Sequence, residues 1–358
     1  MLKAQKVKNG DHMDMCHIKN RIMMQFHITG KCNLQCKHCY RVEGNVEPLS
    51  YKDIINVFNQ FFDLRNTYNE EHKIKKRGHI NITGGEPFIR KDIYDILQFL
   101  GESNDRVTYG VLSNGTPIDD TMIKTLKDTK VSFVQLSIDG NRETHDFMRK
   151  PGDYDRTFKT AATLEKAGIK TFISFTANAS NYKQLSSVAR KCRQAKITKL
   201  WSDRLVPIGN GTELSDLEIT KEILPEYVKY LKIAQGNFLT KKLYPKTQVA
   251  SERALQFLNN INSQIYSCKA AESFLTVDEF GQVMPCRRMP IICGNIFDST
   301  LKDIFYNNEV FINLRNTSLP KECSGCVYNV FCKGGAKCQS YAKYNDYNRA
   351  DPSCPLIR

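Results

Sequence analysis

The chain has 358 residues, of which 41% are apolar and 25% carry a formal charge. This length suggests one large domain with a smaller one, or two comparable domains, and it suffices to bury a core without disulfide bonds. No apolar run approaches the ~20 residues of a membrane helix, and residues 1–14 lack the apolar segment of a signal peptide. We therefore expect a cytoplasmic protein with no membrane partner.

The formal net charge of +14 has two interpretations. It can attract an acidic partner, such as an acidic peptide or a nucleic acid. It can also reflect a lysine-rich solvated surface, which we favour because the Lys and Arg residues are spread along the chain. We expect no nucleic-acid partner.

Six apolar runs alternate with amphipathic segments before residue 245. The runs predict strands at residues 21–28, 79–83, 107–112, 131–138, 170–176 and 199–206. The other segments predict helices at residues 50–65, 93–100, 120–127, 154–167, 182–195 and 217–234. Ser50 and Asp53 have capping-box spacing, and Gly101 and Gly168 are placed to end the second and fourth helices. Strands that alternate with helices pair in parallel, which predicts an α/β fold with an open, partial (β/α)6 barrel.

The composition changes after about residue 245. Residues 274–278 and 282–285 alternate around a glycine-containing turn, which indicates a hairpin. The remainder is loop-rich and dense in cysteine, so we expect bound metal to organise it. We divide the chain into an N-terminal extension at residues 1–20, a barrel at 21–245 and a small loop-rich α+β domain at 246–358.

Thirteen cysteines in a chain expected to be cytoplasmic indicate metal or redox chemistry rather than disulfide bonds. Cys32, Cys36 and Cys39 form one group, and eight others crowd the last quarter of the chain. Cys16 and Cys192 stand apart. They are candidates for hydrogen donors or for inert thiols, and we favour inert thiols because lone buried cysteines are usually unreactive.

The first cysteine group directly follows the first predicted strand with the spacing C-x3-C-x2-C. Three thiolates on one tight loop can hold three irons of a [4Fe–4S] cluster and leave the fourth iron open. A closed zinc site would need a fourth ligand, and His38 lies on a loop too short for easy tetrahedral closure. Chemistry in barrels of this kind lies at the C-terminal ends of the strands, which supports the cluster.

The segment from Cys32 to Tyr40 resembles the signature loop of the radical S-adenosylmethionine (SAM) superfamily. The resemblance implies that the open iron binds the amino and carboxylate groups of SAM. An electron, from a donor such as flavodoxin or ferredoxin, then cleaves SAM to a 5′-deoxyadenosyl radical that abstracts a hydrogen atom from the substrate. The protein positions the reactants and excludes water.

Gly84, Gly85 and Glu86 end the second predicted strand. A G-G-E-P sequence also fits a structural turn, because glycine lets the backbone approach a neighbour closely. Behind this cysteine loop it resembles the superfamily motif that binds the SAM amino group, which implies that role for the three residues. Residues 206–211 end the sixth strand and are expected to lie along the adenine.

Small polar residues end the third and fourth predicted strands. Ser113, Ser137 and Asp139 are by themselves ordinary turn residues. The resemblance implies that they contact SAM, with Ser137 and Asp139 at its ribose or methionine. It also implies that Arg149 meets the SAM carboxylate, for which Arg156 is a weaker candidate. The alternative for Arg149 is a surface cation.

The C-terminal cysteines resemble the SPASM extension of radical SAM proteins, which has the pattern C-x9–15-G-x4-C, a gap, C-x2-C-x5-C-x3-C, a gap, and C. Carried over residue by residue, the resemblance implies an outer auxiliary [4Fe–4S] cluster on Cys323, Cys326, Cys332 and Cys354. A zinc-knuckle-like structural site at residues 323–338 is the alternative.

The same resemblance implies an inner auxiliary [4Fe–4S] cluster on Cys268, Cys286 and Cys338. Cys338 lies two positions beyond the superfamily position, which is Ala336 here. The fourth ligand is left open between Cys293 and an iron that binds substrate.

SPASM-type radical SAM proteins mostly modify ribosomally made peptides or proteins. The resemblance therefore implies a maturase that forms thioether or carbon–carbon cross-links, or oxidises side chains, in a peptide or small protein. The basic composition suits an acidic peptide.

Three alternatives remain open. Anaerobic sulfatase maturases place an aspartate where this chain has Arg287. A small-molecule or tetrapyrrole-modifying enzyme would share the same domains. A non-enzymatic iron–sulfur electron carrier or nucleic-acid-binding metal module is disfavoured, because it would need no SAM pocket.

Overall fold

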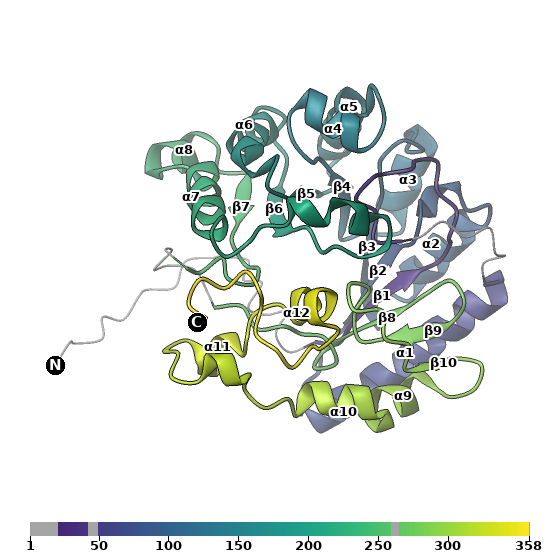
Figure 1. Cartoon of the computed structure of the whole chain (residues 1–358). Coiled ribbons are helices and arrows are strands. Elements are labelled where there is room, and N and C mark those ends of the chain that lie inside the picture. Colours follow the sequence, from purple (N-terminus) through teal and green to yellow (C-terminus); the bar gives the residue numbers. More distant parts are fainter. Residues whose placement is uncertain (1–20, 42–48, 259–264, 358) are drawn as a thin grey trace.

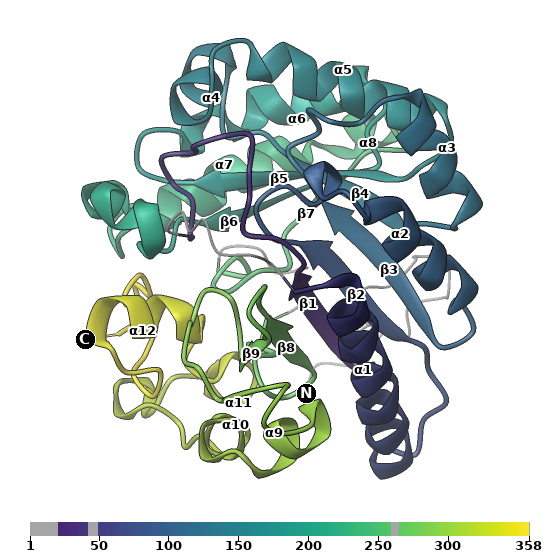
Figure 2. The same cartoon turned by 90° about the vertical axis from the view of Figure 1, so that its right-hand side faces the viewer.

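The computed structural model of the chain describes residues 21–41, 49–258 and 265–357. Cys16 and the expected N-terminal extension lie outside the described residues. The described chain forms an open α/β barrel, and a loop-rich segment with short helices and strands lies against the open side of the barrel (Figures 1 and 2). The expected fold class is confirmed.

The barrel strands pair in parallel and in chain order within the described residues. They are β1 (Met23–His27), β2 (Gly78–Thr83), β3 (Val107–Leu112), β4 (Phe133–Ser137), β5 (Thr171–Ala177), β6 (Lys199–Arg204) and β7 (Gln248–Ala250). The first six confirm the six predicted strands. The sequence did not predict β7, which is three residues long and pairs with β6. It lies just beyond the domain boundary placed at residue 245, and that boundary stays a prediction.

The helices run along the outside of the barrel (Figure 1). They are α1 (Tyr51–Glu71), α2 (Ile93–Glu102), α3 (Asp120–Asp128), α4 (Arg142–Met148), α5 (Asp153–Lys166), α6 (Leu185–Gln194), α7 (Leu224–Gln235) and α8 (Phe238–Leu243). The capping box at Ser50 is confirmed. Gly168, with φ +85°, follows the end of α5 as predicted.

Two predicted helix limits are wrong. Gly101 lies inside α2, which ends one residue later with Ser103 as its cap. The last barrel helix starts at Leu224 rather than at residue 217, because a 3-10 segment ends at Leu217 and Pro225 occupies the first turn of α7. α1 extends to Glu71, because its apolar face continues through the buried Tyr68.

The predicted hairpin is confirmed as β8 (Phe274–Val277) and β9 (Gln282–Met284). It joins the barrel sheet, because β8 pairs in parallel with β1 on the edge opposite β2. With β10 (Gly294–Asn295), the sheet of the described residues has the order β10-β9-β8-β1-β2-β3-β4-β5-β6-β7. Its two ends do not pair, so the barrel stays open.

Four short helices complete the loop-rich segment: α9 (Leu301–Asn307), α10 (Glu309–Arg315), α11 (Asn329–Cys332) and α12 (Lys337–Tyr344). α9 packs against α1. Across the described residues, every helix is too short or too polar to cross a lipid bilayer.

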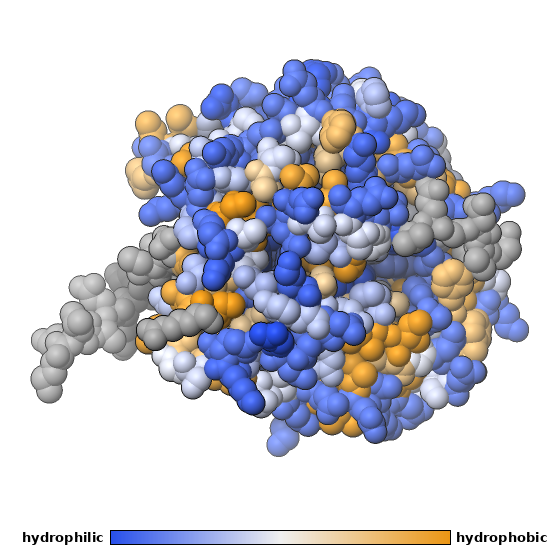
Figure 3. All heavy atoms as spheres, in the orientation of Figure 1, coloured by the Kyte–Doolittle hydropathy of each residue, from blue (hydrophilic) through white to orange (hydrophobic). Residues whose placement is uncertain are grey.

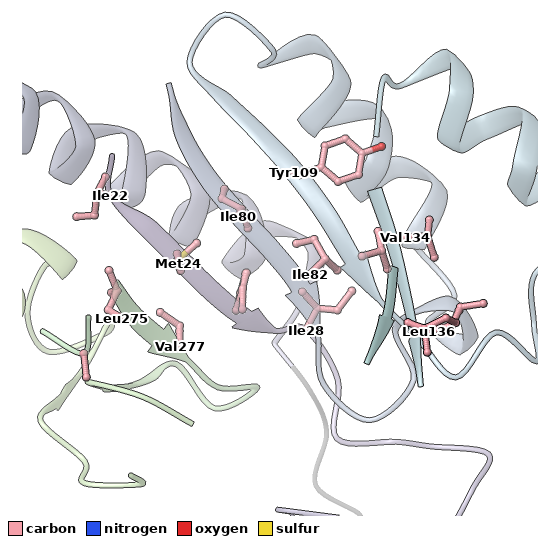
Figure 4. Packing of buried hydrophobic residues seen from close by; sticks show 14 of the residues in the cluster. Ile22, Met24, Ile28, Ile80, Ile82, Tyr109, Val134, Leu136, Leu275 and Val277 are labelled. Carbon is pink, nitrogen blue, oxygen red and sulfur yellow. The ribbon is translucent and has the colours of Figure 1, made fainter. Parts of the chain in front are cut away.

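The hydrophobic core lies between the sheet and the outer helices. Alternate strand residues such as Met24, Ile80 and Val134 are fully buried there (Figure 4). The intervening positions face the barrel interior and are largely polar or aromatic, for example Gln25 and Asn81. Barrel interiors are usually filled by Val, Ile and Leu, so this interior is built to hold something other than its own side chains.

A buried ion pair ties the barrel to the C-terminal segment. Arg204, at the end of β6, donates from Nη1 and Nη2 to the two carboxylate oxygens of Asp351, at 2.9 and 2.5 Å. The side chains are 2% and 0% exposed. Asp351 also accepts from the backbone N–H of Ala336 at 3.0 Å. Removing one charge would leave the other uncompensated in the interior.

We therefore expect Asp351→Asn to lower the free energy of unfolding by about 3–5 kcal/mol. The matched control is Asp155→Asn, because Asp155 pairs with Arg142 at the surface and both side chains are more than half exposed. That change should cost at most about 1 kcal/mol. Urea titrations followed by circular dichroism measure both values, and equal losses would contradict the role of the buried pair.

Candidate active site

The cysteine loop, residues 30–41, follows β1 and rests on the turn that follows β2. Gly85 and Glu86 donate backbone N–H groups to the carbonyls of Thr29 and Lys31, at 2.8 and 2.9 Å. A Cβ atom at Gly84 would lie 2.2 Å from the Thr29 carbonyl oxygen, and one at Gly85 would lie 2.1 Å from that of Lys31. Glycine is therefore required at both positions for the turn to hold the loop.

The loop after β6 holds the cysteine loop from the other side. Gly211 donates its N–H to the carbonyl of Cys39 at 3.2 Å. Gly209 has φ +58°, and a Cβ there would lie 2.3 Å from the Tyr40 carbonyl oxygen. The ends of β2 and β6 thus fix the cysteine loop over the C-terminal mouth of the barrel.

A cavity of 190 Å³, the loop cavity, lies between the cysteine loop and the strand ends. The expected site residues that line it are Cys32, Cys36, Cys39, Gly84, Gly85, Ser113, Ser137, Arg149, Val206 and Asn210. Glu86, Asp139 and Arg156 do not line it. Arg156 is 38% exposed and pairs with Asp153 at 3.8 Å.

Glu86 is fully buried beneath the loop cavity. Its carboxylate accepts from Ser113 Oγ at 2.9 Å and from the backbone N–H groups of Asn114 and Phe88, at 2.7 and 3.1 Å. Burial raises the pKa of Glu86 to about 7, and these hydrogen bonds oppose the rise. Glu86 therefore joins the turns after β2 and β3, and its expected contact with SAM stays a prediction.

Asp139 and Arg149 form a buried pair beside Cys36. Arg149 donates Nε to Asp139 Oδ2 at 2.6 Å, and its Nη1 lies 3.7 Å from Cys36 Sγ. His38 Nε2 lies 3.4 Å from the same Asp139 oxygen. Despite the burial of Asp139, the Arg149 charge holds the pKa of its carboxyl well below its usual range. The pair positions the Cys36 thiol, and Arg149 still lines the loop cavity.

The three thiols of the cysteine loop line the loop cavity together. Burial raises the pKa of Cys36 to about 11, and charge on Cys32 and Cys39 adds to the rise. The pKa of Cys32 is also raised, chiefly by burial and further by Glu86 and Cys39. Asn114 Nδ2 lies 4.0 Å from Cys32 Sγ.

The structure assembles the C-terminal thiols into two further groups. Cys268, Cys286 and Cys338 line one cavity in the barrel interior and are called the inner group. Burial raises the pKa of Cys338, Arg288 opposes the rise, and Cys286 and Cys268 add to it. In the outer group, burial first and Cys354 second raise the pKa of Cys323 to about 11 and that of Cys332 to about 12. The four outer thiols, Cys323, Cys326, Cys332 and Cys354, line one small cavity.

Cys293 and Cys192 lie outside these groups. The pKa of Cys293 is raised to about 12 by burial alone, and its Sγ donates to the carbonyl of Ile291 at 3.3 Å. Cys192 on α6 is fully buried in the hydrophobic core, and burial raises its pKa to about 12. Both environments favour the protonated, unreactive thiol.

The three thiol groups offer the soft donors that iron–sulfur clusters take. Among the described residues, no three His, Cys, Asp or Glu side chains converge closely enough to hold a single metal ion. All twelve cysteines of the described residues are free thiols, and the groups hold three, three and four of them. In each group burial raises the pKa of at least two thiols, and bound iron would replace their protons.

A second cavity, the chamber, occupies the barrel interior below the loop cavity and has a volume of 570 Å³. Leu112, Gln135, Arg287 and Arg288 line both cavities. The chamber is also lined by the inner thiols Cys268, Cys286 and Cys338. A molecule in the chamber therefore lies between the cysteine loop and the inner thiol group.

Positive charge dominates the chamber wall. Seven Lys and Arg residues line it against three acids. The acids are paired: Asp203 with Arg288 at 2.6 Å, Glu272 with Lys269 at 2.7 Å and Glu252 with Lys199 at 3.6 Å. The other four cations form no salt bridge among the described residues, and they are Arg21, Arg253, Arg287 and Lys333. The charge of Arg253 nevertheless helps to lower the pKa of Asp203.

Sequence reasoning missed the β6 wall of the chamber. Trp201 donates Nε1 to Gln135 Oε1 at 3.1 Å, and Arg253 lies 4.3 Å above its ring. Lys199, Trp201 and Asp203 occupy alternate positions of β6 and all line the chamber. This alternation was visible in the sequence and would have identified them as inward-facing.

Two family models match the chain. The model of the radical SAM superfamily matches residues 26–192, and that of an iron–sulfur cluster-binding domain, SPASM, matches residues 268–327. The chain belongs to the radical SAM superfamily. It is an enzyme, and its cofactors are [4Fe–4S] clusters and SAM.

Relatives of this radical SAM enzyme act on different substrates. An AdoMet-dependent heme synthase of Methanosarcina barkeri is 27% identical over 344 residues, which cover 93% of this chain and 95% of the relative. The mycofactocin maturase MftC of Mycolicibacterium smegmatis is 25% identical and matches 93% of this chain and 82% of its own.

Among solved structures, SuiB of Streptococcus suis bound to S-adenosylmethionine has a TM-score of 0.73 at 18% identity. That likeness covers 95% of this chain and 78% of SuiB. SuiB bound to its precursor peptide SuiA also gives a TM-score of 0.73, at 16% identity, and covers 99% of this chain and 84% of that one. At these identities the likeness shows a shared fold.

The environment of Glu86 predicts a dependence of stability on pH. The folded chain keeps the Glu86 proton up to a pKa of about 7, whereas the ordinary value is 4.5. Between these values the folded state binds more protons than the unfolded state, so stability falls as pH rises. The shift corresponds to about 3 kcal/mol.

Glu86→Gln removes this titration. Both proteins are compared without clusters. As the pH rises from about 5 to about 8, the unfolding free energy of the variant should fall by about 3 kcal/mol less than that of wild type. Urea titrations across that range measure the difference. Parallel curves for the two proteins would show that Glu86 titrates normally in the folded chain.

Proposed function

We propose that this radical SAM enzyme abstracts a hydrogen atom from a ribosomally made, acidic peptide whose reacting segment enters the chamber. This proposal rests on the chamber, which has a volume of 570 Å³ and extends from the loop cavity to the inner thiols. Four of the cations that line it form no salt bridge within the described chain. Arg21, Arg253 and Arg287 are half-buried and Lys333 is exposed, and half-buried cations of this kind favour a carboxylate-bearing substrate.

The outer wall of the chamber supports a substrate larger than a metabolite. Val330 and Phe331 of α11 line the chamber and are 72% and 62% exposed. The neighbouring Val327 is 82% exposed. Figure 3 shows the face seen in Figure 1 as mostly hydrophilic, with hydrophobic patches around the C-terminal segment. Exposed apolar side chains beside a substrate cavity suit a peptide that continues outside it.

The site residues divide into two proposed roles. Cys32, Cys36 and Cys39 hold the catalytic cluster, which with bound SAM supplies the 5′-deoxyadenosyl radical. The residues that line the loop cavity and contact SAM are Gly84, Gly85, Ser113, Ser137 and Arg149. Glu86 and Asp139 act through these neighbours, because their carboxylates bond protein donors beneath the cavity.

The two C-terminal thiol groups are proposed as ligands of two auxiliary clusters. The outer cluster takes four thiols, and the inner cluster takes Cys268, Cys286 and Cys338. Cys293 lies outside the inner group. The fourth ligand position of the inner cluster is therefore proposed to face the chamber. Cys338, at the start of α12, lines the chamber with Cys268 and Cys286, which supports its place in this ligand set despite its displaced position in the sequence.

A tetrapyrrole carboxylate is the second candidate substrate. His79, Phe133 and Phe172 form a continuous aromatic stack along the chamber wall, with ring centroids 5.6 and 4.4 Å apart. Such a wall suits a flat aromatic molecule, and the chamber volume is in the usual range for small-molecule sites. The heme synthase relative matches almost the full length of both chains.

A sulfatase-maturase activity is disfavoured by Arg287. Its guanidinium lies 4.8 Å from the centre of the Tyr40 ring, where the two cavities meet. The acid that would accept a proton at this sequence position is therefore replaced by a cation.

The catalytic role of the cysteine loop predicts the outcome of a triple substitution. Wild-type protein reconstituted without oxygen should hold roughly twelve irons, as three clusters. Replacing Cys32, Cys36 and Cys39 with alanine should remove about four of them and abolish 5′-deoxyadenosine formation. Iron assays and chromatography measure these values, and 5′-deoxyadenosine production by the variant would refute the assignment.

Mass spectrometry distinguishes the two substrate classes. The reduced enzyme is incubated with SAM and either a short acidic precursor peptide encoded beside it or an iron porphyrin carboxylate. We expect the peptide to lose two hydrogens and 5′-deoxyadenosine to form in parallel. Modification of the porphyrin alone would replace the peptide proposal by the tetrapyrrole one.

A further inference from the structure

The floor of the chamber, at the N-terminal ends of the strands, gathers polar groups without partners. Arg21, Met23 and Gln25 line the chamber from alternate positions at and before β1. Gln25 is 4% exposed, and its Nε2 has no hydrogen-bond partner among the described residues. The same holds for the buried Nε of Arg21.

The groups around Arg21 do not neutralise its charge. Arg21 Nη1 donates to Thr108 Oγ1 at 3.1 Å, and it forms no ion pair within the described chain. His79, beside it on β2, bonds Thr108 Oγ1 and Asn81 Oδ1 at 2.8 and 3.1 Å. Burial first, and then the charge of Arg21, lower the pKa of His79 to about 3, so His79 is neutral. Arg21 is half-buried, with its Nε fully enclosed, and such a cation beside unsatisfied donors is stabilised when an anion binds there.

A third unsatisfied group lies on the neighbouring strand. Thr276 of β8 pairs with Gln25 in register, so the two side chains share one face of the sheet. Thr276 is fully buried, and its Oγ1 also lacks a partner in the described part of the chain. The donors without partners therefore cluster on β1 and β8.

We propose that Arg21 and Gln25 form an anion subsite in the chamber floor that binds a carboxylate of the substrate far from the reacting carbon. This subsite rests on the proposed function and specifies its substrate. Arg21 and His27 are six positions apart along β1, or about 20 Å. The substrate is therefore a long molecule with a carboxylate at the end remote from the cysteine loop, and an amino-acid-sized molecule does not span the chamber.

Fluorescence of the single tryptophan provides the test. Trp201 is the chain's one tryptophan, and it lines the chamber. The probes are coproporphyrin III with its methyl ester, and a glutamate-rich peptide with its glutamine counterpart. Each is titrated into the full-length, cluster-loaded protein. We expect the carboxylate form of one pair to bind at least about tenfold more tightly than its neutral form, and the pair that shows this preference identifies the source of the carboxylate.

Arg21→Gln should weaken binding of that carboxylate probe about tenfold and leave binding of the neutral form unchanged. Gln25→Leu should act in the same direction, and Arg21→Lys should retain most of the affinity. The matched control is Arg77→Gln, because Arg77 lies near Arg21 but bonds Asn104 at the surface and does not line the chamber. It should leave all affinities unchanged.

Two results would overturn the subsite alone. One is wild-type affinity for the carboxylate probe in Arg21→Gln. The other is an equal loss for the charged and neutral forms, which would indicate a structural defect. A wild-type protein that prefers neither carboxylate form would overturn both the subsite and the anionic substrate. If Arg21→Gln modified a probe with the wild-type rate and affinity, the subsite proposal would be wrong, but the proposed function would not be contradicted.

Discussion

The pairing of β1 with a strand on each side fixes the cysteine loop relative to the C-terminal hairpin. β1 pairs in parallel with β2 on one side and with β8 on the other. The cysteine loop follows β1 directly, and the hairpin that leads to Cys286 starts with β8. β1 therefore delivers the catalytic thiols to the barrel mouth, whereas β9 runs back antiparallel to β8 and leads to Cys286, which lines the chamber below. Arg41 of the cysteine loop and Glu279 of the hairpin turn form an ion pair across this junction.

The local sequence was sufficient to predict the barrel. Val107 to Leu112 forms a strand with the predicted limits, because alternation and flanking turns define it locally. The attachment of β8 to β1 was not predictable in this way, since the two strands are about 250 positions apart and parallel pairing leaves no local signature. β7 was also missed, because it is only three residues long and pairs in parallel with β6, so its sequence shows no alternation that would identify a strand.

The candidate site was predictable to a similar extent. Cysteine spacing, read through the resemblance to a family, grouped Cys268, Cys286 and Cys338; these three line the chamber together, and their role as cluster ligands stays a prediction. The detailed environments of Glu86 and Asp139 were not predictable, because burial beneath the loop cavity depends on tertiary packing. Arg287 and Arg288 line both cavities. Their position where the two cavities meet could not be predicted from the sequence, because it depends on the tertiary fold.

The proposed function requires that the substrate reacts in the chamber. Ala250 of β7 lines it and is 6% exposed, so a phenyl group at this position would fill part of the chamber without touching the loop cavity. The decisive measurement is the ratio of substrate modification to SAM cleavage in Ala250→Phe with wild-type iron content. We predict that 5′-deoxyadenosine formation without substrate stays within about twofold of wild type, while substrate modification falls at least about tenfold. Unchanged modification by this variant would contradict the chamber as the substrate site.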